Sequence, residues 1–349
     1  MKIYHILKSY FKDFETFDMV YRRYDESFRY YHNKSHILSI CSMIDLMADE
    51  HEINAVQRDV LYMAALYHDA IYDPKSETNE RDSADLFTED IEKCNVHMAP
   101  EIAQMVFEVI KYSDPRLYSK LPCECSGAPR KLIDLFISCD LRPFFEEDIG
   151  RVIRNYKLIL REYQFVPYDI FVSAHLDFVV LLERTGWFDE RFINQYWKYV
   201  EGYIPSIGVY AGSFNPFHIG HMSVLEQAER VFDKVIIATP ASASHMIPIA
   251  DILPYHEVRE FEGLFVDHVT TDYPYGYVTV VRGLRNGNDL EYEINMQLVN
   301  YDLKESDFGY MYFITNYPHV SSTVVRDLFI HDRTAGFKYI PDRYNGVVS

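Results

Sequence analysis

The sequence predicts a multidomain protein in which an all-α domain precedes an α/β domain with a Rossmann-like parallel sheet. Residues 1 to about 200 carry apolar residues at three- and four-residue spacing, which is typical of amphipathic helices. After Tyr203-Ile204-Pro205, short apolar strands alternate with glycine turns and helices, which indicates a parallel sheet covered on both faces. We therefore expect domains at residues 1–203 and 204–349, each long enough to bury its own core.

The expected elements follow from these two patterns. Helices are expected in the first domain at Ser35–Met47, Val56–Ile71, Ser83–Ile91, Glu101–Ile110, Asp148–Tyr163 and Tyr168–Thr185. Strands are expected in the second at Ile207–Gly212, Lys234–Thr239, Tyr277–Arg282 and Tyr310–Thr315, with helices at His221–Phe232, Asp289–Leu303 and Ser321–Ile330. Parallel sheets bind ligands at the carboxyl ends of their strands, so we expect a site there.

Charge and cysteine content narrow the class of protein. The 349 residues carry 34 basic and 53 acidic side chains, a net charge of −19, which argues against nucleic acid as a partner. There is no apolar run of membrane-spanning length and no signal-peptide layout. Five cysteines without a signal indicate reduced thiols in the cytoplasm. The Cys123-Glu-Cys125 pair has no second pair after it, so we interpret it as a loop.

A motif in the second domain is suited to phosphate binding. Gly212-Ser-Phe-Asn-Pro-Phe-His218-Ile-Gly220-His221 follows a strand and opens a helix. Its glycines allow close backbone approach, and the helix N-terminus offers free amides and partial positive charge. We expect His221 to stabilise the pentacoordinate α-phosphate of a nucleotide and His218 to assist, both as hydrogen-bond donors. The alternative is that these histidines merely cap the helix.

Two further motifs also carry phosphate-binding groups. In Val320–Arg326, the hydroxyls of Ser321, Ser322 and Thr323 stand at a helix start, with Arg326 one turn later. In Arg282–Glu293, two arginines stand at the carboxyl end of a strand, ahead of an acidic helix start. The alternatives are an ordinary serine-capped helix and surface pairs between these arginines and the nearby carboxylates.

Together, in this order, the three motifs resemble the nucleotidyltransferase superfamily with the His-x-Gly-His signature, and most closely bacterial phosphopantetheine adenylyltransferases, over about Ile207 to Phe329. The resemblance implies transfer of AMP from ATP to 4'-phosphopantetheine, giving dephospho-coenzyme A and pyrophosphate, usually with Mg²⁺. It implies that ATP is held by Ser213, Phe214, His221, Gly283, Arg285, Glu293 and the segment from Tyr317 to Thr323. Ser213 and Arg282 would meet the acceptor phosphate.

Three features leave the acceptor open. His218 stands where this family usually has threonine, whereas nicotinamide mononucleotide adenylyltransferases have histidine. The Ser-Ser-Thr-x-x-Arg326 ending also resembles that second family. The lysine that follows the second strand in the first family has no match in Thr239–His245. Nicotinamide mononucleotide is therefore the alternative acceptor. CTP replaces ATP elsewhere in the superfamily, but the Arg-Gly-Leu-Arg stretch resembles the ATP-using branch.

Histidines and aspartates recur in the first domain in a pattern suited to a metal. Tyr31-His32-Asn-Lys-Ser-His36 precedes His68-Asp69, and Asp140 follows. An adjacent histidine and aspartate near a helix end can both turn to one ion. Imidazole and carboxylate ligands suit a divalent transition metal with open water positions.

These residues resemble the HD-type metal-dependent phosphohydrolases from about Tyr21 to Leu182, with further matching pieces at Asp73, Asn79–Ala84, Cys139–Leu141 and Leu160–Tyr163. The resemblance implies His36, His68, Asp69 and Asp140 as ligands of Mn, Fe, Ni or Zn, His32 as the acid for the leaving oxygen, and Glu80 as a residue that orients water. Related members often carry another histidine ahead of the last aspartate, and Val109–Asp114 has none, so one metal is expected. The alternative is a noncatalytic sensor or assembly domain.

The sequence thus predicts a bifunctional cytoplasmic enzyme, an HD-type phosphohydrolase of unassigned substrate joined to an adenylyltransferase. Its expected partners are ATP and a small phosphate-bearing acceptor, with no nucleic acid and no membrane. Family likeness suggests a homo-oligomer.

Overall fold

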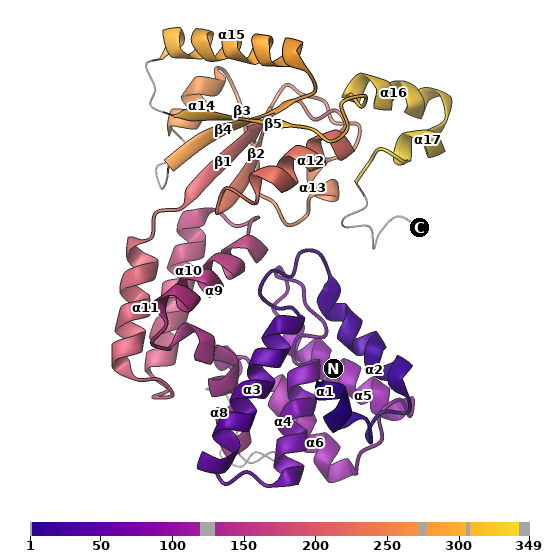
Figure 1. The fold of residues 1–349 in the computed structure, drawn as a ribbon, viewed down its shortest axis with the longest axis vertical. Coiled ribbons are helices and arrows are strands. Elements are labelled where there is room, and N and C mark those ends of the chain that lie inside the picture. The colour runs from indigo at the N-terminus through magenta and orange to yellow at the C-terminus, as the bar shows by residue number, and fades with distance from the viewer. Residues whose placement is uncertain (1, 119–129, 272–276, 305–307, 342–349) are drawn as a thin grey trace. The chain divides into compact units, whose positions relative to one another are not determined.

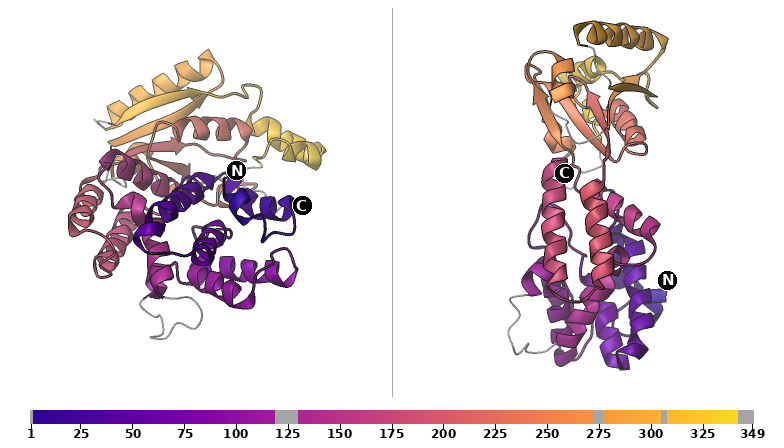
Figure 2. Two further views of the ribbon diagram at one scale, coloured as in Figure 1. Left: turned by 60° about the horizontal axis from the view of Figure 1, so that its bottom comes forward. Right: turned by 90° about the vertical axis from the view of Figure 1, so that its left-hand side faces the viewer.

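The computed structural model describes residues 2–118, 130–271, 277–304 and 308–341. The chain forms two compact units (Figures 1 and 2). The N-terminal unit comprises Met1–Glu162 and Ala174–Glu201, and the C-terminal unit comprises Tyr163–Ser173 and Gly202–Ser349. A single boundary after residue 203 was expected. The structure instead assigns an earlier segment to the C-terminal unit as well.

The segment Tyr163–Ser173 joins the C-terminal unit through a buried lysine. Lys234 Nζ donates to the carbonyl oxygens of Gln164, at 2.5 Å, and Val166, at 2.8 Å. The Gln164 side chain accepts from the amide of Val235 and donates to the carbonyl of Asp233. A buried ammonium group needs such partners, and no local sequence pattern indicates that they lie about 70 residues earlier.

The N-terminal unit is helical in its described residues. Its elements are α1 (Lys2–Leu7), α2 (Phe14–Tyr21), η1 (Arg22–Asp25), α3 (Lys34–Glu50), α4 (Ala55–Tyr67), α5 (Asn79–Glu92), α6 (Pro100–Lys111), α7 (Pro115–Tyr118), α8 (Arg130–Leu141), η2 (Arg142–Phe144), α9 (Ile149–Glu162), α10 (Tyr168–Glu183) and α11 (Glu190–Gly202). The start of α10, up to Ser173, belongs to the C-terminal unit. Our expectations omitted several of these helices, α8 among them. Residues on nearly every side of α8 are buried, so the helical period is hidden in a continuous apolar run.

Helix α4 is the centre of this unit. Every residue from Val60 to Tyr67 is buried, which is typical of a helix surrounded by others. Asn54 caps its N-terminus in a reciprocal hydrogen-bonded pair with Gln57. The helix was expected to continue to Ile71 but ends at Tyr67. His68 and Asp69 therefore follow directly after its last turn.

The C-terminal unit contains a five-stranded parallel sheet in the order β3-β2-β1-β4-β5. The strands are β1 (Ser206–Ala211), β2 (Lys234–Pro240), β3 (Val258–Phe261), β4 (Tyr277–Leu284) and β5 (Gly309–Ile314). The helices are α12 (Ile219–Ala228), α13 (Ile249–Ile252), α14 (Phe265–Thr271), α15 (Gly287–Leu303), α16 (Ser322–His331) and α17 (Arg333–Phe337). The expected strands are present, but β3 was missed because this short edge strand carries charged residues.

Apolar side chains form a core cluster on each face of this sheet. On β1, Ile207 and Val209 belong to one core cluster while Tyr210 belongs to the other, as the alternation along a strand requires. The chain runs outward from β1 to β3 on one side and from β4 to β5 on the other. The direction reverses between β1 and β4, and such a switch point opens a crevice at the carboxyl ends of the strands.

Helix α15 differs from the other helices in the apolar surface that it exposes. Its exposed large apolar residues are Leu290, Tyr292, Ile294, Met296, Leu298, Val299, Tyr301 and Leu303. The expected homo-oligomer stays a prediction.

None of the described helices is both long enough and apolar enough to cross a membrane. Cys41, Cys94 and Cys139 are free thiols. The expected loop at Cys123 and Cys125 lies outside the described residues.

Candidate functional site

The turn from β1 into α12 places two histidine rings face to face. His218 is the N-cap of α12, and its Nδ1 accepts a hydrogen bond from the amide of Gly220 at 3.1 Å. The amide of His218 donates to Nδ1 of His221 at 3.2 Å, and the ring centroids lie 3.7 Å apart. Because both Nδ1 atoms accept from amides, we assign the proton of each neutral ring to Nε2.

Both of these rings are neutral at pH 7. Burial lowers the pKa of His218 to about 4, and the positive charge of Arg285 acts in the same direction. Burial, His218 and Arg285 together lower the pKa of His221 well below its usual value. The alternative that we considered, that the histidines only cap the helix, is correct for one atom, since Nδ1 of His218 accepts from an amide of the first turn. Capping through Nδ1 leaves the Nε2–H group as a donor.

The glycines of this turn make room for neighbouring rings. A Cβ atom at Gly220 would lie 2.9 Å from Cε1 of His218, and one at Gly212 would lie 2.9 Å from the ring of Phe214. Phe214 itself has a φ of 43°, in the left-handed region that side chains seldom adopt. The turn thus depends on residues that leave space for the rings.

A cavity of about 380 Å³ lies at the switch point of the sheet. The expected site residues that line it are Ser213, Phe214, His218, His221, Arg282, Gly283, Arg285, Glu293, Ser321 and Ser322. They come from the turn after β1, from β4 and the residue that follows it, from α15, and from the starts of α12 and α16, which are separated in sequence. Tyr210, Val224, Tyr292 and Thr315 also line the cavity and were missed. Two of these residues could have been identified from the sequence, because Tyr292 lies within the Arg282–Glu293 motif and Thr315 directly follows β5.

Three expected nucleotide-binding residues are outside the lining of this cavity: Tyr317, Thr323 and Arg326. Arg326 donates from Nη1 to the carbonyl of Asn215 at 2.5 Å and from Nη2 to Oγ1 of Thr323 at 3.1 Å. Its contacts therefore join α16 to the β1–α12 turn.

The two arginines of the cavity are paired with carboxylates. Arg282 makes two parallel 2.7 Å hydrogen bonds to Glu293 and donates to the carbonyl of Ala211. Arg285 donates to Asp289 at 2.9 and 3.0 Å. The alternative interpretation, in which the arginines pair with nearby carboxylates, is thus correct for both. The Arg282–Glu293 pair is largely buried in the cavity wall rather than on the surface.

The serines at the start of α16 are also engaged. Ser321 is the N-cap and accepts from the amide of Val324 at 3.3 Å. Ser322 donates to the carbonyl of Pro216 at 3.2 Å. The serine-capped helix that we considered as an alternative is therefore present, and both serines still line the cavity.

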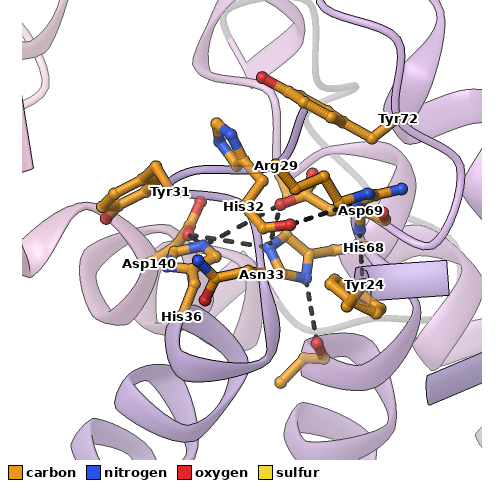
Figure 3. Close-up of polar contacts among 12 residues, drawn as sticks. Tyr24, Arg29, Tyr31, His32, Asn33, His36, His68, Asp69, Tyr72 and Asp140 are labelled. Carbon is orange, nitrogen blue, oxygen red and sulfur yellow. Dashed lines mark hydrogen bonds and ion pairs between the residues drawn. The ribbon is translucent and has the colours of Figure 1, made fainter. Parts of the chain in front are cut away.

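In the N-terminal unit, two histidines and two aspartates converge from α3, the end of α4 and α8 (Figure 3). Nε2 of His36 lies 2.8 Å from Oδ1 of Asp140, and Nε2 of His68 lies 2.9 Å from Oδ2 of Asp69. The crossed distances are 4.0 Å for His36–Asp69 and 3.8 Å for His68–Asp140. All four expected metal-ligating residues therefore meet, although Asp140 lies 104 residues after His36 in the sequence.

The chemistry of these groups fits a cation. Both Nε2 atoms are buried and make no well-aligned hydrogen bond among the described residues. Nδ1 of His68 lies 3.1 Å from the carbonyl of Ala65 and donates to it, so Nε2 carries the lone pair. A lone pair that faces a carboxylate needs positive charge. Without an ion, a proton on His68 supplies part of this positive charge, because Asp69 and Asp140 raise the pKa of His68 against the effect of burial. A divalent ion would satisfy both imidazoles and both carboxylates.

His32 lies beside this cluster in a hydrogen-bonded network. Its Nδ1 lies 2.5 Å from Oε2 of Glu162, which also accepts from Tyr72 Oη at 2.7 Å. Oε1 of Glu162 accepts from the amides of Tyr31 and His32. Burial opposes the charged ring, but Glu162 and Asp69 outweigh it and raise the pKa of His32 to about 9. Sequence reasoning noted Leu160–Tyr163 without giving Glu162 a role.

Two more groups surround the cluster. Arg29 is buried and donates to the backbone carbonyl of Asp69 at 2.7 Å, a role that sequence reasoning missed. Burial, reinforced by Asp114 and Asp69, raises the pKa of Glu80 to about 7. Glu80 lies in the first turn of α5. This carboxyl group can therefore accept or give up a proton near neutral pH.

Comparison with known proteins identifies the family to which the C-terminal unit is similar. A family model described as cytidylyltransferase-like matches residues 209–328. The phosphopantetheine adenylyltransferase of Aquifex aeolicus is 32% identical over 132 residues, which are 34% of this chain and 80% of that protein. Its counterpart in Christiangramia forsetii is 33% identical over 146 residues, 38% of this chain and 94% of that protein. The counterpart in Campylobacter fetus subsp. fetus is 34% identical over 142 residues, 37% and 87% of the two chains.

The parallel sheet and its switch-point cavity thus define a nucleotidyltransferase-like domain of the cytidylyltransferase-like class. Through this domain the chain belongs to the phosphopantetheine adenylyltransferase family. The matched family model lies wholly within the C-terminal unit. The HD-type assignment of the N-terminal unit stays a prediction that rests on its residues and their geometry.

Proposed function

We propose that the C-terminal unit transfers AMP from ATP to 4'-phosphopantetheine and releases pyrophosphate. The single observation that supports this most is the pair of neutral histidines, each with Nδ1 held by an amide, in the switch-point cavity. Family membership supports the same reaction, since the named relatives are phosphopantetheine adenylyltransferases.

In this proposal, an oxygen of the acceptor phosphate attacks the α-phosphorus of ATP while the bond to the bridging oxygen of the β-phosphate breaks. The Nε2–H groups of His218 and His221 donate to the α-phosphate oxygens, where negative charge grows in the transition state. Neutral donors do this without losing a proton. Ser213 and Arg282 meet the acceptor phosphate.

The remaining cavity groups hold the leaving pyrophosphate in this proposal. Ser321 and Ser322 face the β- and γ-phosphates at the start of α16, with Arg285 supplying positive charge. The cavity carboxylates Asp289 and Glu293 are already paired with arginines. Mg²⁺ would therefore be held mainly by the nucleotide phosphates, where it supplies charge neutralisation.

The test is pyrophosphate release by the purified full chain with ATP and Mg²⁺, comparing 4'-phosphopantetheine with nicotinamide mononucleotide. Release with phosphopantetheine alone is the expected result, and CTP in place of ATP should give much less. Release with the nicotinamide nucleotide alone would identify the unit as a nicotinamide mononucleotide adenylyltransferase, the alternative that His218 favours. Absence of pyrophosphate release with both acceptors would contradict both acceptor assignments, and only the class of reaction, nucleotidyl transfer, would still be proposed.

We also propose that the N-terminal unit hydrolyses a phosphate monoester with one divalent transition ion, Mn, Fe, Ni or Zn. The supporting observation is the convergence of His36, His68, Asp69 and Asp140, which would hold the ion. When bound, the ion would supply Lewis-acid activation. His32, kept protonated by Glu162, donates its proton to the leaving oxygen. Glu80 orients the attacking water.

This second proposal is tested by metal analysis of the full chain and by phosphate release from a panel of monoesters after loading with each ion. We expect one ion per chain and phosphate release with at least one ion. One bound ion without any phosphate release would favour the alternative of a noncatalytic sensor. Absence of any bound ion would contradict both interpretations.

A further inference from the structure

A second, smaller cavity adjoins the histidine–aspartate cluster of the N-terminal unit. It has a volume of about 160 Å³ and is lined by residues of α3, η2 and α9 and by the loop before α3. His36 lines it and, through Nε2, also faces Asp140. The cavity is therefore placed to receive whatever is attached to a phosphate bound at the cluster.

The hydroxyl of Tyr31 is the main reason to expect a ligand here. Tyr31 lines this cavity and is only 7% exposed. Among the described residues its hydroxyl has no hydrogen-bond partner. The ring packs against His36 and Phe144, with centroids at 4.7 and 5.2 Å, and lies next to Asp140 in Figure 3. A buried hydroxyl without a partner loses its hydrogen bonds to water and gains none in return, so a phenylalanine would fill this position at less cost unless a ligand uses the oxygen.

The other polar groups of the cavity offer hydrogen bonds without net charge. Ser39 on α3 accepts a hydrogen bond from Arg151 at 3.4 Å. The charge of Arg151 is offset by Glu146, with Nε 3.3 Å from Oε1. Asn155 donates to the carbonyl of Pro143 at 3.0 Å, which leaves its side-chain oxygen as an acceptor. Such a lining suits hydroxyl groups better than a second phosphate.

The volume limits the size of the ligand group. Pockets for drug-sized ligands measure roughly 300–1,000 Å³, about two to six times this cavity. A single sugar ring is therefore a better match than a complete nucleoside.

We propose that this cavity binds the polyhydroxylated alcohol portion of a sugar phosphate, with the hydroxyl of Tyr31 bonded to a sugar oxygen and the phosphate at the cluster. The proposal rests on the hydrolase function proposed above and names its substrate class. In the reaction, a water oxygen bonds to phosphorus and the bond from phosphorus to the sugar oxygen breaks. The sugar leaves as an alcohol with the proton of His32, one proton of the water stays on the inorganic phosphate, and the other water proton replaces the one that His32 gave up.

The experiment compares the wild type with Tyr31→Phe in the full chain. The probes are ribose 5-phosphate and inorganic phosphate, measured by titration calorimetry in EDTA, where the proposed metal-dependent hydrolysis does not consume ribose 5-phosphate. We expect ribose 5-phosphate to bind more tightly than phosphate, and Tyr31→Phe to weaken only ribose 5-phosphate, by about 5- to 10-fold for one lost hydrogen bond. Because Tyr31 lies in the N-terminal unit, binding in the C-terminal cavity is the same in both proteins and cancels.

Thermal unfolding without ligand provides a second readout. Removing an unpartnered buried hydroxyl should leave the Tm of Tyr31→Phe unchanged or raise it. Tyr62→Phe is the matched control, since Tyr62 is also buried but bonds Asp45 at 2.5 Å. It should lower the Tm and leave ribose 5-phosphate affinity unchanged. A lower Tm in Tyr31→Phe together with unchanged affinity would mean that Tyr31 is structural, which overturns the proposal.

Failure of the proposal and failure of the hydrolase function are distinguishable. Equal effects of Tyr31→Phe on both probes, or no preference for ribose 5-phosphate in the wild type, would overturn the sugar cavity. Because the cavity is formed by protein groups alone, the variant difference remains measurable in EDTA. Loss of the hydrolase function would appear separately, as absence of phosphate release from ribose 5-phosphate with every loaded ion.

Discussion

Histidines serve opposite electrostatic purposes in the two units. His32 in the N-terminal unit faces Glu162, and its pKa is raised to about 9. His218 in the C-terminal unit faces an amide donor and the charge of Arg285, and its pKa falls to about 4. Burial acts against the charged form in both, so the difference comes from the neighbours. Residue type alone therefore does not predict whether a buried histidine carries a proton.

The carboxylates of the two sites also differ in the groups that they face. Asp69 and Asp140 face imidazole nitrogens, whereas Glu293 and Asp289 are matched by Arg282 and Arg285. In the proposed functions, a cation would complete the first arrangement, and the second would leave donors for an anion. The comparison predicts two sites that respond to different substitutions.

The largest expected effect is in Asp69→Asn, which removes a ligand charge from the N-terminal cluster. We expect loss of bound metal, measured by elemental analysis, and complete loss of phosphate release. Pyrophosphate release should be unchanged. Asp59→Asn is the control, since Asp59 bonds Tyr10 away from the cluster. A parallel fall in pyrophosphate release in Asp69→Asn would show that the two sites are not independent.

His221→Ala removes one Nε2–H donor from the C-terminal cavity. Loss of one such donor lowers kcat by about 10²- to 10³-fold. We expect this fall in steady-state pyrophosphate release, with phosphate release retained. His331→Ala, at the exposed end of α16, is the control. A change in the KM for ATP with kcat preserved would mean that His221 binds substrate and transition state equally well.

Acid should destabilise the C-terminal unit through His218. Its folded pKa, about 4, lies below the unfolded value of about 6.5. The unfolded chain therefore binds the proton first, and stability present above pH 6.5 is lost as the pH falls towards 4. The expected loss is about 3 kcal/mol. Urea unfolding at pH 7 and pH 4 should show a smaller acid loss in His218→Asn, which keeps an N-cap acceptor. Identical acid losses in the two proteins would contradict the neutral, buried His218.

The smallest expected effect is in Gly220→Ala. The added methyl group would contact the ring of His218 at 2.9 Å and displace it from its stack with His221. We expect a fall of about 10-fold in pyrophosphate release, since small displacements at a reacting centre cost this much or more. Gly287→Ala is the matched control, because nothing lies within 4 Å of its added Cβ. An equal fall in both variants would point to helix stability rather than to the position of His218.

Sequence reasoning succeeded where the relevant contacts are local. The strand, glycine turn and helix around His218 and His221 were expected, and the two rings do stack. The edge strand β3 was missed because its sequence, Val258-Arg-Glu-Phe261, lacks an apolar alternation. The pairing of Arg282 with Glu293 was considered only as an alternative, because spacing cannot decide between a carboxylate partner and a ligand.

Four of the five strands, the longer amphipathic helices, the change from a helical to an α/β unit and the residue types at each site follow from the sequence, because periodicity and short motifs act within a few residues. Only the tertiary structure brings His36 to Asp140, His32 to Glu162 and Gln164 to Lys234. These partners lie roughly 70 to 130 residues apart, and packing of α4, α8 and α9 or of β2 decides which of many carboxylates and carbonyls is near. The protonation states depend on those partners, so they too became visible only in the folded chain.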